Sequence, residues 1–211
     1  MPRESEQQKK KRARRILKRL MAAYPHAGIK LNFKTNMQLL AAVILSAQAT
    51  DEHVNEVTKD LFKKYKTVDD FADANIKTLR SELSSVNYYK SKAKYIAESA
   101  RMIRDEYGGK LPRDINEMVK LPGVGRKTAN IVLWNAYGIA QGIPVDTHVK
   151  RVAKKLKLTS KSNPDKVEKD LMNLYHRENW GNMAYYFQAY GRTVMKARGK
   201  PERDDPLKGL Y

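Results

Sequence analysis

Apolar residues recur at helical spacing along most of the chain. The first stripe begins at Ile16 and ends before Pro25, which stops the helix. Residues 37–47 are apolar on nearly every side, a pattern typical of a helix at the centre of a core. Further helices are predicted at about 52–64, 69–73, 75–84, 89–106 and 114–120. Strand-like alternation is almost absent, so the sequence predicts an all-α protein.

A glycine-rich turn interrupts this pattern at residues 121–125, which read LPGVG. Glycine and proline are too disruptive for a helix interior, and Gly123 and Gly125 can both take a positive φ. A helical stripe then runs from Ala129 to Ala136, and Gly138 ends it as a C-cap does. The predicted unit is therefore a helix, a tight hairpin and a second helix.

The second half of the chain continues the helical pattern. Asp146 precedes a helix-like stretch at residues 147–156, and aspartate is a favoured N-cap. An apolar face recurs between Val167 and Tyr175. Residues 180–190 are rich in aromatic side chains, which we interpret as packing rather than as a surface for stacking bases.

The amino-acid composition limits the classes of molecule that this protein could bind. The 211 residues suffice for one large or two small domains, and 42 Lys and Arg against 23 Asp and Glu give a net charge of +19. Such an excess indicates a partner that is either a phosphate polymer or an anionic membrane surface. The longest apolar run, residues 39–45, is too short to span a membrane, and no signal peptide is visible. We expect a cytoplasmic monomer that binds no membrane, with residues 1–15 as a flexible basic tail.

The hairpin carries candidate chemistry. Amides at a helix start lack partners within the helix and attract anions. Arg126 and Lys127 lie in this first turn, where the helix dipole disfavours cations and favours the neutral amine of a lysine. A neutral amine can attack an aldehyde-like carbon and form a Schiff base. Alternatively, both are ordinary solvated cations beside a structural turn.

Asp146 offers a carboxylate that can move a proton or stabilise a developing sugar cation. Its alternative role is the helix cap described above. The two roles are compatible, because a cap holds the carboxylate at a fixed place.

Four stretches carry a resemblance: LPGVGRKTAN, the following VDTHVKRV, LNFKTNMQLLAAVILSAQATD at 31–51 and YYKSKAKYI at 88–96. Together they resemble endonuclease III and the wider helix-hairpin-helix DNA glycosylase superfamily, from Ile16 to Tyr211. The resemblance implies two helical domains flanking a DNA-binding cleft. One is a six-helix barrel at residues 31–140, and the other joins residues 1–30 to 141–211. Lys127 and Asp146 would face each other across the cleft.

The resemblance also implies roles for single residues. Lys127 and Asp146 would be catalytic. Gln48 would enter the DNA where the flipped nucleotide leaves and pair with the orphaned base. Tyr88 stands where the family places a wedge residue, and its alternative is a loop aromatic that covers the core. The remaining candidate DNA-binding residues are Leu121, Gly123, Val124, Gly125, Arg126, Thr128 and His148. An alkali cation held by hairpin carbonyls is a further possibility that the resemblance raises.

The C-terminus departs from the family. Many members end in four cysteines spaced C-x6-C-x2-C-x5-C that hold a [4Fe–4S] cluster. The matching residues here are Met195, Glu202, Asp205 and Tyr211, and the chain has no cysteine. We therefore expect no iron–sulfur cluster and no other metal site. What stabilises this segment instead is left open by the sequence.

Three functions remain. The first is a DNA glycosylase that also cleaves the abasic strand by β-elimination, acting on damaged, oxidised pyrimidines in double-stranded DNA; Lys127 is its distinguishing feature. The second is a monofunctional mismatch glycosylase, whose members generally lack this lysine. The third is a noncatalytic DNA-binding module, which would need neither Lys127 nor Asp146.

Overall fold

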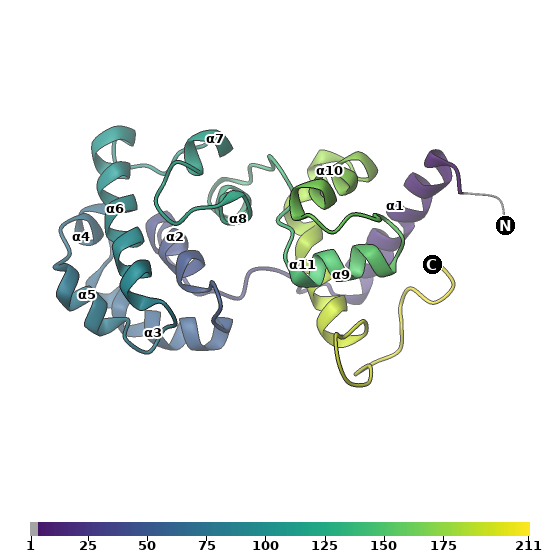
Figure 1. Cartoon of the computed structure of the whole chain (residues 1–211), viewed down its shortest axis with the longest axis horizontal. Coiled ribbons are helices and arrows are strands. Elements are labelled where there is room, and N and C mark those ends of the chain that lie inside the picture. Colours follow the sequence, from purple (N-terminus) through teal and green to yellow (C-terminus); the bar gives the residue numbers. More distant parts are fainter. Residues whose placement is uncertain (1–3) are drawn as a thin grey trace. The chain divides into compact units, whose positions relative to one another are not determined.

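The computed structural model describes residues 4–211, and this range contains helices and turns but no strand (Figure 1). The predicted all-α class is confirmed. The helices form two compact units: unit 1 joins the N-terminal segment up to Ile29 to Ala140–Tyr211, and unit 2 is Lys30–Ile139. Within the described range, no helix has the length and apolarity needed to cross a membrane.

Unit 2 is built around one buried helix. Its helices are α2 (Asn36–Leu45), α3 (Asp51–Lys64), α4 (Val68–Ala72), α5 (Ile76–Glu82), α6 (Tyr89–Tyr107), α7 (Ile115–Met118) and α8 (Arg126–Tyr137). Helix α2 is buried from Met37 to Leu45 and packs against α6 and α8 (Figure 1). The Thr35 side chain caps it by accepting from the Gln38 N–H. The predicted central helix is therefore confirmed.

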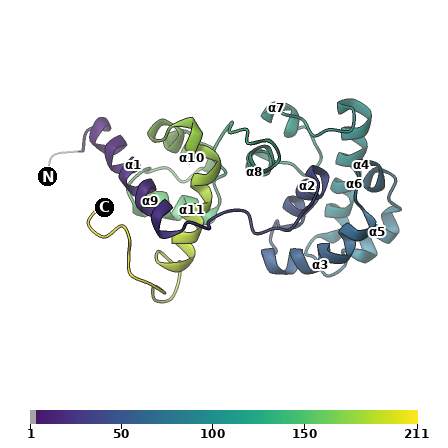
Figure 2. The same ribbon diagram turned by 180° about the vertical axis from the view of Figure 1, so that it is seen from behind.

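Unit 1 consists of α1 (Glu6–Ala23), α9 (Thr147–Lys155), α10 (Pro164–Leu174), the short 3-10 helix η1 (Arg177–Asn179) and α11 (Trp180–Thr193) (Figure 2). Helix α11 packs against both α9 and α1. Its Phe187 and Tyr190 are fully buried, and Tyr185 is 9% exposed. The aromatic stretch therefore serves packing, as predicted.

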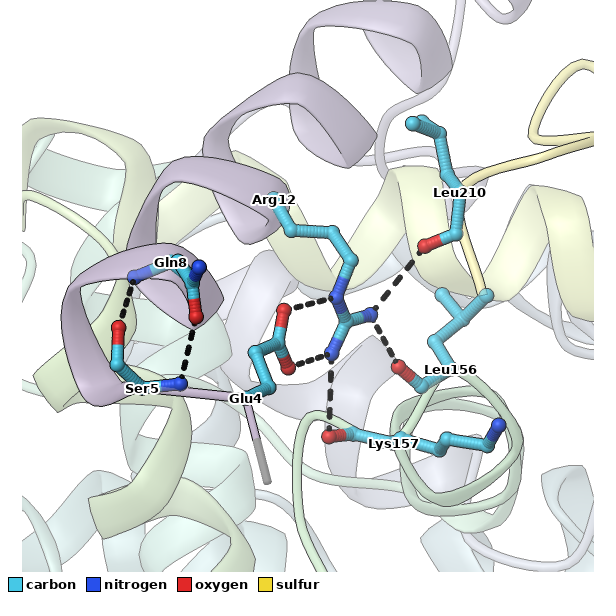
Figure 3. Close-up of polar contacts among 7 residues, drawn as sticks. All are labelled: Glu4, Ser5, Gln8, Arg12, Leu156, Lys157 and Leu210. Carbon is cyan, nitrogen blue, oxygen red and sulfur yellow. Dashed lines mark hydrogen bonds and ion pairs between the residues drawn. The ribbon is translucent and has the colours of Figure 1, made fainter. Parts of the chain in front are cut away.

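Helix α1 begins much earlier than the apolar stripe predicts. Ser5 and Gln8 form a capping box, in which each side chain accepts from the other residue's backbone N–H (Figure 3). Lysine and arginine are good helix formers, so the basic stretch extends the helix without adding apolar positions. The prediction of a flexible tail is wrong for residues 6–15. Its first three residues lie outside the described range.

Arg12 ties α1 to two distant segments (Figure 3). Its guanidinium pairs with Glu4 at 2.8 Å, and Nη1 donates to the carbonyl of Leu156, at the end of α9, at 2.7 Å. A longer bond of 3.4 Å reaches the carbonyl of Leu210 in the C-terminal segment. The rigid fork of arginine suits such divergent acceptors. This contact explains why the basic stretch is ordered as helix.

The C-terminal segment is held by side-chain contacts. Oδ1 of Asp205 accepts from the Tyr190 hydroxyl and from the Leu207 N–H, both at 2.8 Å, and Oδ2 accepts from the Tyr211 hydroxyl at 2.7 Å. Leu207 is fully buried and Leu210 is 5% exposed, so both join the apolar core of unit 1. Among the described residues, no group of three or more His, Cys, Asp or Glu is placed to hold a metal ion. Hydrogen bonds and apolar burial thus stabilise the segment.

Candidate active site

The predicted helix-hairpin-helix is confirmed as α7, residues 119–125 and α8. Leu121 and Val124 are 2% and 5% exposed, and the Val124 N–H donates to the Leu121 carbonyl at 3.1 Å. Gly123 has a φ of 76°, as the turn was predicted to need. Gly125 does not share this conformation: its φ is −86° because it is the N-cap of α8, which requires extended backbone. Only Gly123 therefore reverses the chain.

Two residues of helix α6 contact the backbone of the hairpin. A Cβ at Gly123 would lie 2.6 Å from Cδ2 of Tyr95, so the backbone approaches this ring too closely for any side chain. The Ser99 hydroxyl donates to the Pro122 carbonyl at 2.9 Å. Tyr95 and Ser99 were not among the predicted site residues. Tyr95 lies within the matched stretch at 88–96, but its contact with the hairpin depends on the packing of α6.

Lys127 lies in the first turn of α8 and is exposed, as Arg126 is. No side chain caps this helix start, and the positive end of a helix dipole attracts anions. Within the described range, Lys127 forms no ion pair. Thr128 is half-buried behind it. The turn therefore presents an accessible amine at a helix start that no side chain caps.

Asp146 is the N-cap of α9, which confirms its predicted structural role. Its Oδ1 accepts from the Val149 N–H at 2.7 Å, and the side chain is half-buried. The other carboxylate oxygen has no hydrogen-bond partner in the part of the chain that the structure describes. The cap bond thus fixes the carboxylate at the start of α9.

His148 follows Asp146 in the first turn of α9. Its Nδ1 lies 3.1 Å from Nη2 of Arg151, which also donates to the Gly191 carbonyl at 2.8 Å. Burial lowers the pKa of His148 below its ordinary value, and the Asp146 carboxylate opposes this shift. A Cβ at Gly191 would lie 3.1 Å from Val152, so α11 packs tightly behind this turn. Arg151 and Gly191 were not predicted from the sequence.

Gln48 and Tyr88 share an unusual backbone conformation. Their φ values are 57° and 60°, in the left-handed region that few non-glycine residues adopt. The Tyr88 side chain is 66% exposed, which excludes the alternative that it covers the core. The Asn87 side chain donates to the Gln48 carbonyl at 3.0 Å and joins the two loops. The structure therefore brings these two candidates together within unit 2.

The candidate residues divide between the units. Gln48, Tyr88 and the hairpin with Lys127 belong to unit 2, whereas Asp146 and His148 belong to unit 1. That Lys127 and Asp146 face each other stays a prediction.

Residues 41–177 match the HhH-GPD superfamily of base excision DNA repair proteins. Endonuclease III of Synechocystis sp. is 43% identical over 190 residues, covering 90% of this chain and 87% of that protein. Endonuclease III of Bacillus subtilis is also 43% identical, over 89% of this chain and 85% of that protein. A solved structure of a trapped endonuclease III–DNA covalent intermediate, an estranged-adenine complex, is similar with a TM-score of 0.85 and 40% identity, covering 90% of each chain. The matched residues include every candidate site residue.

Proposed function

We propose the following function from the premise that the chain belongs to the HhH-GPD superfamily of base excision DNA repair proteins, and within it to the endonuclease III homologues. The protein is a DNA glycosylase with abasic-site lyase activity, and double-stranded DNA is its partner. We assign damaged, oxidised pyrimidines as the bases removed. Because its substrate is genomic DNA, we place its action in the cytoplasm, at the nucleoid.

Binding begins with charge. The net charge of +19 supplies attraction to the phosphate backbone that does not depend on sequence. The first amides of α8 then bind one phosphate, with Gly123, Val124 and Gly125 holding the hairpin against it. We propose that Arg126 and Thr128 contact the same strand, that buried Leu121 supports the turn, and that His148 contacts DNA from unit 1.

The target base must leave the duplex before a side chain can reach its sugar. Gln48 and Tyr88 lie on two joined loops of unit 2, and the Tyr88 ring is free to stack. We propose that Gln48 pairs with the orphaned base while Tyr88 fills the gap in the stack.

Lys127 is the nucleophile in this proposal. Its amine nitrogen bonds to C1′ of the flipped sugar, the glycosidic bond breaks, and the base leaves with the bonding electron pair and takes up a proton. The C1′–O4′ bond then breaks, O4′ takes up a proton as the sugar ring opens, and the iminium that forms acidifies C2′. Loss of a C2′ proton then drives β-elimination, which breaks the C3′–O bond and leaves a phosphate on the downstream fragment. Water hydrolyses the imine and frees Lys127.

Asp146 supports this chemistry from a fixed position. With Oδ1 committed to the α9 cap, its other oxygen can accept a proton from the amine or stabilise positive charge on the sugar. The half-buried environment strengthens either effect, because water screens the charge less there.

The accessible Lys127 amine at an uncapped helix start carries the proposal. A monofunctional glycosylase would not need an amine at this place, and a noncatalytic module would need Asp146 only as the cap of α9. The residues present also fit a protein without a cluster, since the chain offers no thiolate and Asp205 already accepts three hydrogen bonds. We propose no metal cofactor for the reaction, and hairpin carbonyls remain the place for an alkali cation.

Borohydride trapping tests the assignment on duplex DNA that contains thymine glycol or an abasic site. Wild-type protein should form a covalent adduct with both substrates, and Lys127→Ala should form none while still binding DNA. Lys120→Ala is the matched control, because Lys120 is an exposed lysine just before the turn at residues 121–125 and pairs with Glu117. Trapping of the abasic substrate alone would leave the lyase and overturn the lesion class. Undiminished trapping by Lys127→Ala would overturn the assignment of the nucleophile.

A further inference from the structure

Strained backbone marks the two loops that carry Gln48 and Tyr88. In the described range, the non-glycine residues with positive φ are these two and Lys157. Each left-handed non-glycine residue costs about 1–2 kcal/mol, so its neighbours must hold it in place. The contacts that hold Gln48 therefore identify the residues on which its position depends.

The first of these contacts is made by Lys92, which binds the backbone just before Gln48. Its side chain is only 4% exposed, and Nζ donates to the carbonyls of Leu45 at 2.8 Å and Ala47 at 2.6 Å. Both carbonyls lie at the end of α2, where they lack partners within the helix and the dipole favours a cation. Burial lowers the pKa of Lys92. Burial removes water from the ammonium, and its hydrogen bonds to two carbonyls offset this loss of solvation. One of these carbonyls belongs to Ala47, the residue before Gln48.

A second contact closes the arrangement. The carbonyl of Gln48 accepts from Asn87, the residue before Tyr88, and the Lys92 N–H donates to the Tyr88 carbonyl at 3.0 Å. Gln48 is therefore restrained on both sides, by Lys92 through Ala47 and by Asn87 directly. The Tyr88 carbonyl is held by the first backbone hydrogen bond of α6, and its neighbour Asn87 joins this loop to Gln48. The two loops form one hydrogen-bonded ring.

We propose that Lys92 is a positioning residue that holds Gln48 and Tyr88 as one rigid unit for entry into the duplex. The proposal rests on the roles assigned above to Gln48 and Tyr88. A buried lysine that served packing alone would gain nothing from its charge, since a methionine of similar shape packs without losing solvation. The ammonium is instead placed where only its hydrogen bonds to the Gln48 loop offset that loss.

Selectivity for damaged DNA tests the proposal. The measurement is the ratio of Kd for undamaged duplex to Kd for a duplex with a tetrahydrofuran abasic analogue opposite 2-aminopurine. Gln48→Ala and Lys92→Met should each lower this ratio about tenfold. If Lys92 acts through Gln48, the double variant should also lose about tenfold rather than a hundredfold. Multiplying losses would overturn the proposal.

The control is Gln38→Leu. Gln38 is 1% exposed and donates to two backbone carbonyls, those of Phe62 and Tyr65, at the opposite end of α2. It matches Lys92 in burial and in the number of carbonyls bound. Gln38→Leu should lower thermal stability without changing the ratio, and Lys92→Arg should restore part of the loss. An equal loss of selectivity in Gln38→Leu would mean that Lys92→Met acts through general stability, which would overturn the proposal.

Asn87→Ala provides a second route if Lys92→Met does not fold. Asn87 is exposed, so its removal should leave the core intact and still release the Gln48 carbonyl. The same cycle with Gln48→Ala should again be non-additive. If Gln48→Ala has no effect on selectivity, Lys92 has no residue to act through and the proposal fails. Borohydride trapping at Lys127 then shows separately whether the proposed enzyme function stands.

Discussion

The Tyr211 hydroxyl donates a 2.7 Å hydrogen bond to Oδ2 of Asp205. Both residues stand at positions where the resemblance places cysteine ligands of an iron–sulfur cluster. The other two positions are also in use: Met195 is 7% exposed, and Glu202 pairs with Lys196 at 2.8 Å. The segment that a cluster would fold is thus held by one direct contact between two of these residues, by an ion pair and by apolar burial.

We predict that Asp205→Ala destabilises the protein by about 2–4 kcal/mol, because it removes the charged acceptor shared by the Tyr190 and Tyr211 hydroxyls and by the Leu207 N–H. Asp204→Ala is the control, since Asp204 is the exposed neighbour. Urea unfolding measures both, and limited proteolysis should cut the C-terminal segment faster in Asp205→Ala. Equal stability of the two variants would show that Asp205 does not hold the segment.

We predict that alanine at Gly123 destabilises the protein much more than alanine at Gly125. Gly123→Ala places a side chain at positive φ and against Tyr95, so it should cost about 2 kcal/mol or more and weaken DNA binding. Gly125→Ala meets no atom within 4 Å and should cost less than about 1 kcal/mol. Thermal unfolding distinguishes them, and similar melting temperatures would contradict the close approach to Tyr95.

Two substitutions of Asp146 should distinguish its effect on stability, as a helix cap, from its effect on glycosylase activity. Asparagine caps a helix as well as aspartate does, so Asp146→Asn should keep stability and lose glycosylase activity. Asp146→Ala should lose activity and about 1 kcal/mol of stability as well. Single-turnover kinetics and urea unfolding give the two quantities. Full activity in Asp146→Asn would show that the carboxylate serves only as a cap.

Tyr88→Ala should affect binding without affecting folding. The side chain is 66% exposed, so the free energy of unfolding should change by less than about 0.5 kcal/mol. Loss of base stacking should weaken binding to an abasic duplex by about 1–3 kcal/mol. Binding titrations with abasic and undamaged duplexes measure this, and equal weakening on both would argue against a wedge.

Stability should fall as the pH drops below about 6.5, in part through His148. Its folded pKa is lowered by burial and by Arg151 and Arg192, although the Asp146 carboxylate opposes the shift. The unfolded histidine therefore takes up a proton at about pH 6.5, whereas the folded one does so only at lower pH, and stability decreases between these two values.

Urea midpoints from about pH 7.5 to 5.5 measure this dependence. His148→Gln should flatten it, and His176→Gln, at an exposed position, should leave it unchanged. A slope that is identical in His148→Gln and wild type would exclude His148 as the titrating group.

The sequence by itself determined the helical class, the buried α2, the hairpin before α8 and the Asp146 cap. Each depends on short-range physics: apolar periodicity, the φ that glycine allows and a hydrogen bond three residues along the chain. The candidate nucleophile could be predicted from the sequence for the same reason, since Lys127 and the hairpin lie within one local motif.

Only the tertiary structure decided which charged residues hold the chain together. Arg12, Lys92 and Asp205 read as surface residues, and the partners of the first two lie up to 198 and 47 residues away. Asp205 binds Tyr190 and Tyr211, which no periodic pattern connects to it. Burial of a charge becomes favourable only when distant backbone or hydroxyl groups converge on it. That convergence is a property of the packed fold, so the sequence alone does not reveal it.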